Sequence, residues 1–150
     1  MIIHFICRGN SFRSIIAEAY LNSLEIKDLT VLSTGTAGAT HKAGNLPYYT
    51  MTLELLGKHG IREYAKADHG DQLTQSLLES ADITVCLNLR VYDECLRLVT
   101  FPASPRIWSV ADIGEPGRIP KVESETELYR EEAYQEIVKN VDQLIAEISA

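Results

Sequence analysis

The sequence has 150 residues, of which 45% are hydrophobic and 23% charged, a composition typical of one globular domain spanning residues 1–150. Its net charge of −7 argues against a nucleic-acid-binding or membrane-surface protein, where basic patches are expected. No apolar run approaches the roughly 20 residues needed to cross a bilayer. Three cysteines, an odd number, and an N-terminus without a secretory signal together predict a reducing, cytoplasmic location.

The chain begins with a strand, a short loop and a helix. An apolar run over residues 2–7 ends at Cys7, a loop containing glycine, asparagine and serine follows, and a helical pattern runs from Arg13 to about Leu24. In such an arrangement the loop amides and the positive helix end converge on one point, where they bind an anion and favour the thiolate of Cys7. The planar guanidinium of Arg13 is suited to holding two oxygens of a phosphoryl group. These residues therefore predict phosphoryl transfer to cysteine.

Strands and helices alternate along the rest of the chain. The predicted strands are 29–35, 82–87 and 106–110. The predicted helices are 48–59, 75–78, 88–99 and 124–148, and Leu128 is expected in the buried stripe of the last helix. The predicted loops are 36–45, 61–71 and 112–121. The alternation predicts an α/β fold, a single doubly wound domain with a four-stranded parallel sheet flanked by helices on both faces. Ligands of such sheets bind beyond the carboxyl ends of the strands, where Cys7, Ser33 and Asp112 all fall.

The stretch Cys7–Ser14, followed by Ile16-Ala17-Glu18-Ala19, resembles the opening of the low-molecular-weight protein tyrosine phosphatase family, which reads C-x-G-N-x-C-R-S-P-x-A-E-A. The resemblance implies a cofactor-free phosphomonoester hydrolase that forms a phosphocysteine on Cys7. It also implies that phosphate is bound, beside Cys7 and the catalytic Arg13, by Arg8, Gly9, Asn10, Ser11, Phe12 and Ser14. The expected partners are a phosphorylated protein or a small phosphomonoester, with inorganic phosphate or a similar oxyanion in the loop, and neither nucleic acid nor a membrane.

The resemblance implies two residues that support this loop. In the family a serine of the second strand bonds the asparagine of the loop, and Ser33 and Asn10 match this pair. The segment from His69 to Thr74 is similar to a family segment whose histidine helps the same contact, so His69 is the second supporting residue. The structural alternatives are an ordinary strand-end serine and a solvated loop histidine.

A cysteine phosphatase must protonate the leaving oxygen and later activate water against the phosphocysteine. The family uses for this an aspartate, normally followed by proline, in the loop after the fourth strand. The segment 108–112 is similar to that loop, with Ile113 in place of the proline, and this makes Asp112 the predicted acid. Glu115, with Pro116 behind it, is the reserve candidate.

The sequence departs from the family at positions that concern the substrate. Few aromatic residues stand near the acid or after the second strand, and Arg8 adds a cation beside the nucleophile. These features favour a small, anionic or non-aromatic phosphoester over phosphotyrosine, with Tyr48 or Tyr49 as a candidate cavity wall. Phe12 stands where the family has a second cysteine, so protection of Cys7 by a disulfide at this position is not expected.

Two other functions stay open at this point. An arsenate reductase of the same fold would use Cys7 with two resolving cysteines near the third strand, for which Cys86 and Cys95 are the candidates. A non-hydrolytic phosphate-binding or phosphocarrier module would use Cys7 without a downstream acid. The four histidines are scattered and show no ligand spacing, so no metal site is predicted.

Overall fold

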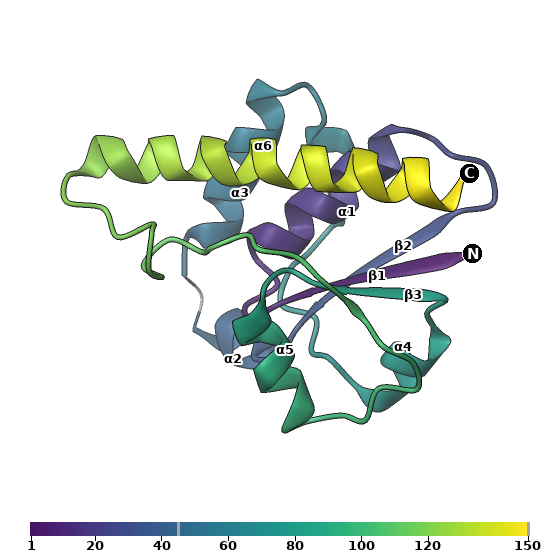
Figure 1. The fold of residues 1–150 in the computed structure, drawn as a ribbon. Helices are drawn as coiled ribbons and strands as arrows, with labels where there is room; N and C mark the ends of the chain where they lie inside the picture. The colour runs from purple at the N-terminus through teal and green to yellow at the C-terminus, as the bar shows by residue number, and fades with distance from the viewer. Residues whose placement is uncertain (45, 150) are drawn as a thin grey trace.

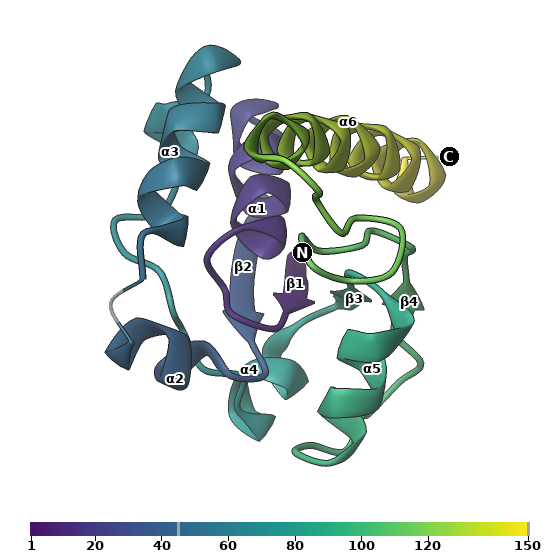
Figure 2. The same ribbon diagram turned by 90° about the vertical axis from the view of Figure 1, so that its left-hand side faces the viewer.

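Four parallel strands form the centre of the computed structural model, which describes residues 1–44 and 46–149. The strands are β1 (Ile2–Cys7), β2 (Thr30–Gly35), β3 (Ile83–Cys86) and β4 (Arg106–Ile107). Their spatial order is β2-β1-β3-β4; Figure 1 labels the first three strands, and Figure 2 shows all four in this order. β1 therefore pairs with β2 on one side and β3 on the other, so its carboxyl end, where the nucleophile candidate stands, lies inside the sheet and not at its edge. The predicted four-stranded parallel sheet is confirmed.

Helices cover both faces of this sheet (Figure 2). They are α1 (Arg13–Ser23), α2 (Gly38–Ala43), α3 (Tyr48–Lys58), α4 (Gln75–Ser80), α5 (Leu89–Leu96) and α6 (Glu123–Ile148), with a 3-10 turn, η1, at Arg62–Tyr64. α1, α3 and α6 lie on one face, and α4 and α5 on the other. The doubly wound α/β class is thus confirmed. None of the described helices is long and apolar enough to span a membrane.

The two faces of β1 contribute to two separate hydrophobic cores. Ile3, Phe5 and Cys7 belong to the larger core beneath α1, α3 and α6. Ile6 belongs to the smaller core beneath α4 and α5. Successive residues of a strand point to opposite faces, so this division follows directly from strand geometry. It places Cys7 on the same side of the sheet as the start of α1.

Two short elements lie where the sequence predicts irregular chain. The predicted loop 36–45 contains α2, and its last residue, Asn45, lies outside the described residues. The predicted irregular segment 61–71 contains η1. α2 buries only the glycine at its start, and η1 buries no residue. Neither element therefore leaves the hydrophobic periodicity by which a helix is found in a sequence.

Other details also differ from the prediction. α5 ends at Leu96, three residues before the predicted end. Leu128 on α6 is 53% exposed, so the prediction that it belongs to the buried stripe was wrong. β4 pairs over two residues only, but the chain beyond it keeps contact with the sheet through two further backbone hydrogen bonds. Trp108 N donates to Cys86 O (2.9 Å) and Val110 N to Leu87 O (3.0 Å). These bonds guide the following loop along β3 toward the carboxyl end of β1.

Candidate active site

Cys7 lies at the floor of a loop, residues 8–12, that connects β1 to α1. Its Sγ accepts a hydrogen bond from the backbone N of Asn10 (3.3 Å) and lies 3.0 Å from Ser14 Oγ. α1 has no side-chain cap at its N-terminus. In the described part of the chain the backbone amides of residues 8, 9, 11 and 12 donate to no protein acceptor. Such amides, at the positive end of a helix, are the donors that an oxyanion binds.

Asn10 fixes the shape of the loop through four hydrogen bonds. Its Nδ2 donates to Ser14 Oγ and to Ser33 Oγ, both at 2.9 Å. Its Oδ1 accepts from Asp71 N and its backbone O accepts from Gly70 N, again at 2.9 Å. The residue has a φ of 50°, a left-handed conformation that asparagine adopts more readily than most residues. The structure therefore brings Asn10 and Ser33 into the contact expected from the sequence.

The hydroxyl of Ser14 links this asparagine to the nucleophile. Because Ser14 Oγ accepts from Asn10, its own proton is free to point at Cys7 Sγ. The thiolate form of Cys7 then receives two hydrogen bonds, one from this hydroxyl and one from the Asn10 amide.

His69 does not support the loop with its ring, and this part of the prediction needs correction. The ring lies 4.6 Å from that of Tyr49, and Nδ1 is 3.2 Å from Asp68 Oδ1. The next two residues, Gly70 and Asp71, make the contacts with the loop through backbone amides. The segment was correctly associated with the loop, but a backbone contact leaves no side-chain signature in the sequence.

Three charged residues, of which only Glu18 is buried, lie behind the loop. Glu18 on α1 is 5% exposed, and burial raises the pKa of its carboxyl, while Lys66 and the Ser33 hydroxyl act in the opposite direction. Lys66 Nζ donates to Ser33 O (2.9 Å) and to Asp71 Oδ2 (2.8 Å). Sequence reasoning did not identify Lys66, which lies in a segment without periodic pattern.

Close backbone packing also holds the loop in place. A Cβ added at Gly35, the last residue of β2, would stand 2.4 Å from Arg8 O and 2.8 Å from Asn10 N. Only glycine therefore allows β2 to pass directly beneath the loop. The sequence indicated Gly35 as the end of a strand but not as a support of the nucleophile loop.

Two side chains from the helices brace the outer side of the loop. Thr52 on α3 is fully buried and donates to Ser11 O at 2.6 Å. His41 on α2 packs against Gly9, where an added Cβ would lie 2.4 Å from the imidazole. Neither contact could be read from the sequence, because each depends on where a distant helix lies over the loop.

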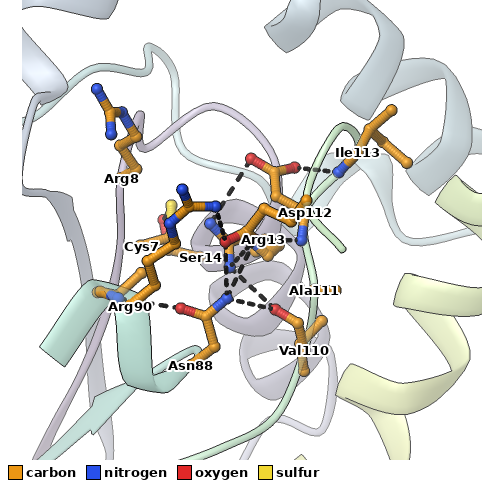
Figure 3. A network of polar contacts seen from close by, with 12 residues as sticks. Cys7, Arg8, Arg13, Ser14, Asn88, Arg90, Val110, Ala111, Asp112 and Ile113 are labelled. Atoms are coloured by element: carbon orange, nitrogen blue, oxygen red, sulfur yellow. Dashed lines mark hydrogen bonds and ion pairs between the residues drawn. The ribbon is translucent and has the colours of Figure 1, made fainter. Parts of the chain in front are cut away.

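Arg13 connects the loop to the acid segment, as Figure 3 shows. Its side chain is 3% exposed, and its Nη1 donates to Val110 O at 2.9 Å. Nη2 lies 3.6 Å from Asp112 Oδ2, and Nη1 lies 3.5 Å from Glu115 Oε1. Both carboxylates that the sequence offered as the acid therefore contact the same guanidinium.

The surroundings of these two carboxylates differ. Glu115 accepts from Asp112 N (2.6 Å), Asn88 Nδ2 (3.1 Å) and Arg90 Nη1 (3.3 Å). Burial alone would raise the pKa of Glu115, but the Asp112 amide, the Arg13 charge, Arg90 and Asn88 together hold that pKa below its usual value. Asp112 instead keeps 39% of its side chain exposed and faces the cavity above Cys7. Glu115 is thus enclosed by donors and positive charge, whereas the carboxylate of Asp112 is open to the cavity.

A cavity of about 330 Å³ opens above the loop. It is lined by Cys7, Gly9, Ser11, Phe12, Arg13, His41, Tyr48, Met51, Asp112, Ile113, Thr126 and Arg130. Tyr48 is the wall residue that the sequence offered together with Tyr49. The side chain of Arg8 is absent from the lining, because it extends to α5 and pairs with Glu94 at 3.2 Å.

The cysteines Cys86 and Cys95 lie on the wrong side of the sheet to resolve an adduct on Cys7. Both are fully buried in the smaller core, beneath α4 and α5, whereas Cys7 belongs to the larger core. Hydrogen bonding with Cys95, and then burial, raise the pKa of the Cys86 thiol well above its usual value. This placement argues against the arsenate reductase alternative. Within residues 1–44 and 46–149, no three His, Cys, Asp or Glu side chains are grouped to hold a metal ion.

Comparisons with known proteins bear on the family and on the fold. A family model described as low molecular weight phosphotyrosine protein phosphatase matches residues 2–150. The fold is similar to that of Vibrio vulnificus Wzb in complex with benzylphosphonate (TM-score 0.73, 20% identity, 97% of each chain covered). It is similar to a YwlE arginine phosphatase mutant with a phosphorylated active-site serine (TM-score 0.62, 21% identity, 96% of this chain and 95% of that one). It is also similar to the tyrosine phosphatase Wzb from Escherichia coli K30 in complex with sulphate (TM-score 0.65, 18% identity, 98% and 97%). No curated protein gives a significant sequence match.

Proposed function

Because the chain belongs to the low molecular weight phosphotyrosine protein phosphatase family, a family of phosphoric monoester hydrolases, we propose that it acts through a phosphocysteine on Cys7, with Asp112 as general acid and base. One observation carries this proposal. Cys7 Sγ, with its two hydrogen-bond donors, lines the same cavity as Asp112 and Arg13. A nucleophile, an anion-binding cation and a proton donor thus face one space.

In the first step the Cys7 thiolate forms a bond to phosphorus while the bond from phosphorus to the leaving oxygen breaks. The amides of loop 8–12 and the guanidinium of Arg13 bind the other phosphoryl oxygens. Asp112 gives its proton to the leaving oxygen, so that the alcohol departs neutral.

In the second step Asp112, now a carboxylate, takes a proton from a water molecule as the water oxygen bonds to phosphorus. The bond between phosphorus and Cys7 Sγ breaks, and inorganic phosphate leaves with the thiolate restored. The exposed position of Asp112 suits this role, because water reaches its carboxylate from the cavity. The second carboxylate, Glu115, remains ionised and keeps Asp112 and Arg13 in place.

The relatives support the proposal in two ways. Two Wzb structures contain benzylphosphonate and sulphate, which resemble a phosphoryl group in shape and charge. A YwlE mutant carries phosphate on its active-site serine. For this chain we propose the same kind of oxyanion site at the loop, with either a phosphorylated protein or a small phosphomonoester as the substrate.

The proposal is tested with p-nitrophenyl phosphate and a rapid acid quench. The wild-type protein should release phosphate and show a transient phosphate label on Cys7, and Cys7→Ser should lose turnover. Cys95→Ser is the matched control and should keep both signals. Stable label on Cys7 without phosphate release would indicate a phosphocarrier, and absence of both label and release would refute the proposal.

A further inference from the structure

The cavity above Cys7 extends away from the nucleophile to the first turns of α6. Thr126 and Arg130, one helical turn apart, line it there, with Tyr48 and Met51 of α3 opposite. These four residues, which we call the outer cavity wall, come from helices far from the loop in sequence. They lie where the group attached to a bound phosphate would extend.

Arg130 is the unusual member of this outer cavity wall. Its only hydrogen bond with a protein acceptor in the described residues is from Nη2 to Met51 Sδ (3.0 Å), and it forms no ion pair there. A thioether is a weak acceptor for a guanidinium. The other arginine of the cavity, Arg13, is by contrast paired with Asp112 and Glu115.

A partly buried cation without a carboxylate partner is electrostatically complementary to an anion that enters the cavity. The planar fork of arginine favours carboxylate or phosphate oxygens, which it binds with two parallel hydrogen bonds. The cation expected from the sequence, Arg8, does not serve here, because its side chain pairs with Glu94 outside the cavity. Of the two arginines that line the cavity, the one without a carboxylate partner in the described residues is therefore Arg130, on α6.

We propose that Arg130 is a specificity residue that binds an anionic group, a carboxylate or a second phosphate, on the leaving group of the substrate. This inference rests on the proposed function, since it places the reacting phosphate at the Cys7 loop. Tyr48 and Met51 pack against the apolar part between the two anionic ends, and Thr126 offers a hydroxyl beside Arg130. The same charge disfavours a cationic leaving group such as the guanidinium of phosphoarginine.

The test uses phosphonates, which bind without turnover. The dissociation constants of 4-carboxybenzylphosphonate and 4-carbamoylbenzylphosphonate are measured by calorimetry. The two compounds differ only in the group at the end of the ring away from the phosphonate, which is a charged carboxylate in the first and a neutral amide in the second. The wild-type protein should bind the carboxylate roughly tenfold more tightly, the size of effect expected for a hydrogen bond to a charged group. Arg130→Met should bind both equally, and Arg130→Lys should keep part of the preference.

Arg97→Met is the matched control, because Arg97, the residue that follows α5, is exposed and does not line the cavity, and its loss changes the net charge equally. It should leave the preference intact. A wild-type preference below twofold, or one that survives in Arg130→Met, overturns the inference, as does failure of both phosphonates to bind. If the preference depends on Arg130 but no ester is hydrolysed, the inference stands and the proposed function fails.

Discussion

The carboxylate of Glu115 accepts a hydrogen bond of 2.6 Å from the backbone amide of Asp112. This contact places the two acid candidates in one small turn, and the tasks that we propose for the two carboxylates differ. Asn88, Arg90 and Arg13 surround Glu115 with donors and positive charge. The carboxylate of Asp112 instead lines the cavity with Cys7. This difference supports Asp112 as the proposed acid, because a group that gives up and regains a proton in each turnover must be reached from the cavity.

Substitution of the two carboxylates should separate these tasks. Asp112→Asn should lower kcat by roughly 10²–10⁴-fold, the usual size of general acid–base assistance, and should remove the loss of kcat at high pH. Glu115→Gln keeps an oxygen that can accept from the Asp112 amide and should lower kcat less, with that pH dependence retained. Steady-state kinetics between pH 4 and pH 8 measure both effects. A loss below threefold in Asp112→Asn would show that Asp112 is not the acid.

The two buried cysteines provide a second test. Because the sheet separates Cys86 and Cys95 from Cys7, each single replacement by serine should leave phosphatase turnover within about threefold of wild type. The replacements should instead lower the free energy of unfolding. A hydroxyl buried among apolar side chains, with only the weakly bonding thiol of the other cysteine as a partner, lowers the free energy of unfolding by about 1–3 kcal/mol. Urea denaturation measures that loss, whereas a reductase would lose arsenate turnover in at least one variant.

The strand, loop and helix at the start of the chain could be predicted because their signals are local: an apolar run, a glycine-bearing loop and a helical period. The Asn10–Ser33 contact could be proposed only from resemblance, since a sequence does not show which residues of different strands face each other. Thr52 and Arg130 were missed for a related reason. Their roles depend on how α3 and α6 cross above the loop, and this arrangement is set by tertiary packing.

Gly35 gives a prediction that follows from packing alone. In Gly35→Ala the new methyl group would collide with Arg8 O, a backbone atom, so the nucleophile loop must move. We expect a loss of about 1–3 kcal/mol in the free energy of unfolding, typical of overpacking, and a fall in kcat/KM of more than tenfold. Gly57→Ala is the control, because Gly57 lies within α3 and has space for a Cβ. It should stabilise the protein by about 0.5–1 kcal/mol without changing kcat/KM. Equal changes of the free energy of unfolding and of kcat/KM in the two variants would contradict this role of Gly35.

His4 lies fully buried in β1, where its Nε2 is 2.7 Å from Thr34 Oγ1. Burial, with a smaller contribution from the charge of Lys66, lowers the pKa of His4 from 6.5 to about 4. Between these two values the unfolded chain binds a proton at this residue and the folded chain does not. The free energy of unfolding therefore falls as the pH is lowered through this range, and it is regained as the pH rises.

The size of this effect is about 3 kcal/mol, since each pKa unit corresponds to about 1.4 kcal/mol. Burial raises the pKa of Glu18, and this shift changes the free energy of unfolding with the opposite sign. The contribution of His4 must therefore be measured as a difference between two proteins that differ only at this residue. We expect the free energy of unfolding of the wild-type protein, minus that of His4→Gln, to decrease by about this amount from pH 7 to pH 4. Because glutamine keeps a polar group near Thr34 but does not titrate, a difference that stays constant over this range would show that His4 is not held neutral by the fold.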